Sequence, residues 1–152
     1  MQLHLPPDIS SRLIEALTEA GRREIGGILM GEHVGPDTFV VRDITIQRKG
    51  GTFAAFLRAV SEILGPLRAF FDSTKHDYKK FNYLGEWHSH HSFQLHPSST
   101  DHATMCDMIM DPNVGANFVV LLLVKVGSRQ NLEAGLTVYQ PNKRPYAGNV
   151  DM

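Results

Sequence analysis

Apolar and polar positions alternate along the chain with helix-like and strand-like periods in turn. The first periodic segment is an apolar stripe at helical spacing, made of Ile9, Leu13, Leu17 and Ala20. Pro6-Pro7-Asp8 precedes this stripe and Gly21 follows it. Because proline favours the first turn of a helix and glycine its end, the pattern predicts a helix that stops at Gly21.

Strand-like segments dominate the rest of the pattern. A buried strand is predicted over 24–30 and a second over 39–47, with a turn over 31–37 between them and a break at Lys49-Gly50-Gly51. Three further strands are predicted, over 82–89, 116–126 and 132–139. The segment 116–126 is almost uniformly apolar, which indicates a central strand that is buried on both faces.

Two more helical segments lie between these strands. Residues 52–80 have a helical pattern that Gly65-Pro66 interrupts, which predicts a helix pair or one bent helix. A loop through Pro97 leads to a helix over 99–110, and residues from about 141 to 152 resemble a loosely held tail. Since the two kinds of element are mixed without a boundary, we expect one α/β (α+β) domain over residues 1–152.

Composition excludes several classes of function. Hydrophobic residues make up 42% and charged residues 20% of 152, the usage of an ordinary globular domain. A net charge of −1 gives no basic field for nucleic acid, and the longest apolar run, 118–124, is far below the roughly 20 residues of a membrane helix. No export signal precedes the first helix, and the one cysteine, Cys106, fits a reducing compartment. We therefore expect a cytoplasmic protein that binds neither nucleic acid nor membrane.

Histidine is the one anomaly. Eight histidines occur, and five of them lie between His88 and His102. His88 and His90 are two residues apart at the end of a predicted strand, so their side chains share one face. Zinc accepts histidine nitrogen and carboxylate oxygen, and catalytic sites use three protein ligands and a water. Asp101, in the first turn of the next helix, can supply the third ligand.

Each part of this pattern also has a purely structural interpretation. An isolated His-x-His is more often a surface or core pair than a metal site, and Ser98-x-x-Asp101 is a variant of the helix capping box. The combination is more specific than its parts. His88-Ser89-His90, seven residues, Ser98, two residues and Asp101 would arise by chance in roughly one chain in a thousand.

This combination resembles the signature of the JAMM (MPN-plus, or JAB) metalloproteases, H-[ST]-H-x(7)-S-x(2)-D, at every fixed position. Glu24, in its glycine-rich apolar segment, resembles the glutamate that the family carries on an early strand. The resemblance extends from Ile9 to about Tyr139. It implies a single MPN/JAB domain with a mixed central sheet flanked by helices, a topology like that of cytidine deaminases.

The resemblance also implies Zn²⁺ as the cofactor and a role for each matching residue. His88, His90 and Asp101 would hold the metal, Glu24 would be the general base, and Ser98 would donate to the developing oxyanion. The alternatives are a surface ion pair for Glu24 and a helix cap for Ser98.

One departure from the family pattern is the absence of a proline after the second histidine. His91 stands there, and His91, His96 and His102 are rival ligands. His91 should point away from His88 and His90 if the strand continues, and the alternative for His96 and His102 is a surface residue or a partner of the ligands. Trp87 is expected in the core or the cleft wall. Cys106 would need an activating base to act as a nucleophile.

The resemblance to small bacterial members implies the substrate class. We expect cleavage of an amide bond after the C-terminal tail of a ubiquitin-like protein, with E1-like and E2-like enzymes of the same operon as further partners and antiphage defence as one setting. The resemblance also implies an insertion at about 49–82, which would grip the substrate by strand addition at a sheet edge. Its aromatic residues can equally pack in the core: Phe53, Phe56, Phe70, Phe71 and Tyr78. The alternatives are a sulfur-carrier adduct as substrate and a non-catalytic scaffold. A zinc deaminase is a further alternative, but its metal site needs a pair of cysteine ligands, and this chain has a single cysteine.

Overall fold

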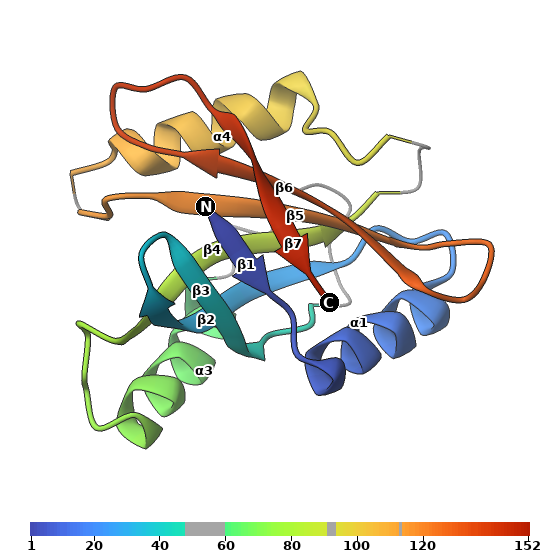
Figure 1. The fold of residues 1–152 in the computed structure, drawn as a ribbon, viewed down its shortest axis with the longest axis horizontal. Helices are drawn as coiled ribbons and strands as arrows, with labels where there is room; N and C mark the ends of the chain where they lie inside the picture. Colours follow the sequence, from blue (N-terminus) through green and yellow to red (C-terminus); the bar gives the residue numbers. More distant parts are fainter. Residues whose placement is uncertain (48–59, 91–93, 113) are drawn as a thin grey trace.

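A computed structural model describes residues 1–47, 60–90, 94–112 and 114–152 of this protein (Figure 1). The described strands form one closed barrel in the order β1-β3-β2-β4-β5-β6-β7. Their bounds are β1 Gln2–His4, β2 Gly26–Gly35, β3 Thr38–Ile44, β4 Phe81–Ser89, β5 Val119–Val126, β6 Leu132–Tyr139 and β7 Tyr146–Asp151. The described helices are α1 Pro7–Ala20, α3 Val60–Ser73 and α4 Ser99–Met110. No described helix has the length and apolar character to span a membrane.

The sheet is mixed, as predicted. β1 runs parallel to β3 and β7, and β4 runs parallel to β5, whereas the other pairs are antiparallel. The helices lie outside the sheet (Figure 1). The predicted stripe of α1 is buried in the main core, where it shares a cluster with Trp87 and Leu122. The helix over 99–110 and the strand over 132–139 have the predicted bounds.

Two predicted segments are wrong. Residues 31–35, expected in a turn, belong to β2, because they pair with β3 on one side and β4 on the other. The tail from 141 is also wrong, since β7 pairs with β6 and with β1 and thereby closes the barrel. Its side chains are mostly exposed, so backbone hydrogen bonds hold β7 and leave no hydrophobic pattern to detect.

The predicted interruption at Gly65-Pro66 does not divide the helix within the described residues, because α3 continues through both. Its end packs on the barrel through Phe70, which is buried against Phe81. Residues 48–59 lie outside the described residues, and with them the break at 49–51, the start of the predicted helical segment, Phe53 and Phe56.

Candidate metal centre

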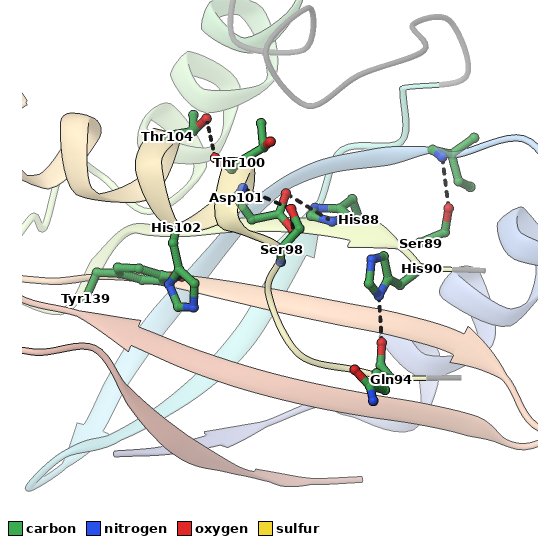
Figure 2. A network of polar contacts seen from close by, with 11 residues as sticks. His88, Ser89, His90, Gln94, Ser98, Thr100, Asp101, His102, Thr104 and Tyr139 are labelled. Atoms are coloured by element: carbon green, nitrogen blue, oxygen red, sulfur yellow. Dashed lines mark hydrogen bonds and ion pairs between the residues drawn. The ribbon is translucent and has the colours of Figure 1, made fainter. Parts of the chain in front are cut away.

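The end of β4 and the first turn of α4 bring His88 and Asp101 together (Figure 2). Nε2 of His88 lies 3.8 Å from Oδ1 of Asp101, and both side chains are largely buried. This separation is beyond hydrogen-bond range. Two ligands of a tetrahedral zinc ion, each at about 2.1 Å from it, lie roughly 3.4 Å apart. The gap therefore suits two atoms that share a cation.

Asp101 has a second role as part of a helix cap. Its Oδ2 accepts hydrogen bonds from the backbone N–H of Ser98 at 2.7 Å and from the Ser98 hydroxyl at 2.8 Å, while the Asp101 N–H donates to Ser98 Oγ at 3.2 Å. This is a complete capping box. One carboxylate oxygen thus orients the helix, and the other faces His88. The single hydrogen of the Ser98 hydroxyl points at Asp101, so donation to a substrate oxygen would require this hydroxyl to turn.

His90 is held by a backbone carbonyl. Its Nδ1 lies 2.6 Å from the carbonyl oxygen of Gln94 (Figure 2). Because a carbonyl oxygen only accepts, Nδ1 carries a hydrogen in this contact, and Nε2 is the ring nitrogen that a metal ion would use. Metal-binding histidines are usually fixed in this way. The sequence pattern gave no sign of Gln94, since its contribution is a main-chain atom.

The three predicted ligands do not form one closed group here. The rings of His88 and His90 are 6.0 Å apart between centroids, at 78° to each other. Within residues 1–47, 60–90, 94–112 and 114–152, no three His, Cys, Asp or Glu side chains are placed to hold one metal ion. The structure thus brings His88 and Asp101 together, with His90 beside them.

Burial controls the charge of two neighbours on β4. It lowers the pKa of His88 to about 4, an effect to which His90 adds and which the Asp101 carboxylate opposes. His88 is therefore a neutral imidazole at pH 7. Burial also raises the pKa of Glu86 to about 8, against the hydrogen bond from Tyr83. No pattern in the sequence indicates that Glu86 lies so deep in the core.

Glu24 is exposed and lies just before β2, not within the strand as predicted. The backbone N–H of Ile25 donates to Ser89 Oγ at 3.0 Å, and the Ser89 N–H donates to the Ile25 carbonyl at 2.8 Å. Continuing this antiparallel register sets Glu24 opposite His90 at the end of β4. The backbone therefore carries Glu24 to the same end of the sheet as the histidines.

The glycines after Glu24 allow the strands to approach closely. A Cβ at Gly26 would meet the Trp87 carbonyl oxygen at 2.5 Å, and one at Gly27 would overlap the Thr45 carbonyl. Trp87 is fully buried and donates its indole N–H to the Thr45 carbonyl at 2.9 Å, which confirms its place in the core.

The remaining histidines differ in position. His102 points away from the site, and its Nδ1 lies 2.9 Å from the Tyr139 hydroxyl (Figure 2). His96 is exposed, as is Cys106. His91 lies outside the described residues.

A cavity of about 440 Å³ opens beside His90. Its walls come from the ends of α1, β4 and β5, and the Lys125–Glu133 ion pair, at 3.1 Å, is part of its lining. The site therefore has space next to it for a group larger than water.

Comparison with known proteins gives one family and several similar folds. A sequence model of the family described as prokaryotic homologs of the JAB domain matches residues 6–135. The chain is similar to the solution structure of a Desulfitobacterium hafniense protein, with a TM-score of 0.61, 14% identity, and coverage of 97% of this chain and 90% of that one. It is also similar to the solution structure of a Salinibacter ruber protein, with a TM-score of 0.55, 15% identity, and coverage of 97% of this chain and 90% of that one.

A third similar structure is a JAB1/MPN domain protein from Archaeoglobus fulgidus, with a TM-score of 0.47, 12% identity and full coverage of both chains. No curated protein matches the sequence.

Proposed function

This chain belongs to the prokaryotic homologs of the JAB domain, and from that premise we propose that it is a zinc-dependent isopeptidase or peptidase. Its substrate in this proposal is the amide bond after the C-terminal tail of a ubiquitin-like protein, in a conjugate or a precursor. The observation that supports the proposal best is the 3.8 Å approach of His88 Nε2 to Asp101 Oδ1 in a buried setting.

The residues at this site fit a zinc ion in their chemistry. The neutral imidazole of His88, the imidazole of His90 with its Nδ1–H directed at a carbonyl, and a carboxylate oxygen of Asp101 are the donor types that catalytic zinc sites use. A bound zinc ion would supply an acidified water and would polarise the substrate carbonyl.

The protein's own groups would handle the protons. Glu24 takes a proton as water adds to the carbonyl carbon, and it returns a proton to the leaving amine as the carbon–nitrogen bond breaks. Ser98 donates to the carbonyl oxygen once its hydroxyl turns from Asp101. The cavity beside His90 receives part of the substrate next to the cut bond.

The test uses the full chain loaded with zinc and a panel of ubiquitin-like proteins that end in Gly-Gly. Each is joined through that end to a lysine side chain, to a following peptide or to cysteine. Cleavage should occur after the second glycine. Glu24→Gln should bind zinc and fail to cleave, while Glu15→Gln, an exposed glutamate on α1, should cleave normally. Full turnover by Glu24→Gln would contradict its role as the base.

The panel also separates the alternatives. Cleavage of the cysteine adduct alone would indicate a sulfur-carrier substrate. A non-catalytic JAB scaffold is favoured by one observation, the lack of a closed three-ligand group among the described residues. A protein that takes up no zinc and cleaves none of the substrates would support the scaffold hypothesis over the hydrolase. The partners in this proposal are the ubiquitin-like protein and its conjugating enzymes, in the cytoplasm.

A further inference from the structure

A second groove lies at the other end of β4 from the histidines. It has a volume of about 550 Å³ and runs between the start of β4, the turn after α3 and the segment before β5. Tyr83, which lines this groove, is five residues from His88, or about 16 Å along a strand. The groove is therefore separate from the candidate metal centre.

One wall of the groove is an open strand edge. β4 pairs with β5 only over Gly85–Ser89, so residues 81–84 have no strand partner on that side among the described strands. The strands separate at Gly85, where β4 has φ +148° and its pairing with β2 shifts register. This bulge turns the first part of β4 away from β5.

The direction of the backbone groups follows from the pairing with β2. The His33 N–H donates to the Lys80 carbonyl at 2.8 Å. The backbone N–H and C=O groups of Lys80 and Asn82 therefore point toward β2, and those of Phe81 and Tyr83 point toward the groove. The groove-facing N–H of Phe81 already donates to the Asp77 carbonyl at 2.8 Å, so an incoming strand would meet the Phe81 carbonyl instead. The groove-facing N–H of Tyr83 donates to the Asn82 side chain at 2.9 Å. That bond lies within one short segment, and the carbonyl of an incoming strand can replace it.

The lining of the groove is aromatic and basic. Phe71, Tyr78 and Phe118 contribute rings to it. Its charged side chains among the described residues are Lys79 and Lys80, and no carboxylate lines it. Lys80 also pairs with Glu32 at 2.9 Å, whereas Lys79 is exposed at the rim.

We propose that this groove binds an extended acidic peptide segment of a partner protein, which adds as a strand to residues 81–84. The open edge supplies backbone hydrogen bonds, the rings accept alternate apolar side chains, and Lys79 attracts the carboxylates. The groove is an anchoring site, independent of hydrolysis.

The test measures binding by fluorescence anisotropy on the full chain. The probe is a capped, fluorescein-labelled peptide of alternating glutamate and valine. One control peptide has lysine in place of glutamate, and another is N-methylated at alternate residues so that it cannot pair as a strand. Lys79→Glu should weaken binding of the glutamate peptide about tenfold. Lys143→Glu, the same charge change in the loop between β6 and β7, should leave binding unchanged.

The position of the peptide is followed by backbone amide chemical shifts. They should change over residues 81–84 and 116–118 and remain constant around His88. No binding of the glutamate peptide at millimolar concentration would overturn the proposal. Equal binding of the lysine or N-methylated peptide, or shifts centred on His88, would overturn it as well.

Discussion

Two buried carboxylates of this protein have opposite electrical surroundings. Glu32 and Asp101 expose 8% and 6% of their surface. Glu32 lies 2.6 Å from Nε of Arg42 and 2.9 Å from Nζ of Lys80. Within the described residues, the one basic side chain within 4 Å of an Asp101 carboxylate oxygen is His88, which is neutral at pH 7 because burial lowers its pKa to about 4.

The difference separates a structural acid, Glu32, from a proposed metal ligand, Asp101. Burying a carboxylate is unfavourable unless a cation or several donors compensate. At Glu32 the fold provides both cations, which join β2 to β3 and to the residue before β4. At Asp101 it provides one hydroxyl and one backbone N–H on one oxygen, and it directs the other oxygen at an imidazole. The second region can therefore gain from a cation taken from solution.

The substitution Asp101→Asn should have the largest effect on the difference between the two carboxylates. The amide oxygen can still accept the Ser98 N–H, but the negative charge is lost. We expect zinc affinity to fall at least about a hundredfold, because a direct ligand should matter more than the groups that orient it. Unfolding free energy without metal should change by less than about 1 kcal/mol. Calorimetric zinc titration and urea unfolding measure the two effects, and unchanged zinc affinity would remove Asp101 from the ligand set.

Glu32→Gln should have the opposite profile. It leaves Arg42 and Lys80 without their shared anion, which should lower the free energy of unfolding by about 2 kcal/mol. Zinc affinity should be unchanged. Urea unfolding beside the exposed-site control Glu15→Gln measures the loss, and an equal loss in both variants would refute a special role for the Glu32 cluster.

Ser98→Ala tests how much the capping box contributes to stability. Loss of the hydroxyl removes one donor from Asp101 and one acceptor for its N–H, and it should cost about 1 kcal/mol of stability. Ser98→Thr should restore most of this stability. Thermal unfolding compares the three proteins, and a Ser98→Ala protein as stable as the wild type would show that the cap contributes little.

The smallest effect concerns pH. Hydrogen bonds from Lys80 and from Arg42 hold the pKa of Glu32 below its usual 4.5, although burial acts in the opposite direction. The stabilisation from Glu32 is therefore present above pH 4.5 and is lost as the pH falls through the lowered value. The difference in melting temperature between wild type and Glu32→Gln should shrink in that range. A constant difference down to pH 2 would contradict this assignment.

Local patterns predicted the elements that bury a regular face. The α1 stripe and the first turn of α4 follow from side-chain spacing and capping chemistry, both of which the sequence displays. β7 was missed because its side chains are exposed. The proximity of His88 to Asp101 was predicted from the motif, but the carbonyl that orients His90 depends on a loop path. The groove depends on the bulge at Gly85, which no periodicity reveals.

The pairing of β1 with both β3 and β7 also bears on how this chain acquires its shape. Leu3 pairs with Val150, across almost the whole described chain, so the ring cannot be completed by local contacts. Pairings of such long range are slow to form. On the ribosome, the ring would remain open until β7 had emerged, and β1, paired with β3 on one side, would meanwhile present its other edge to other nascent chains.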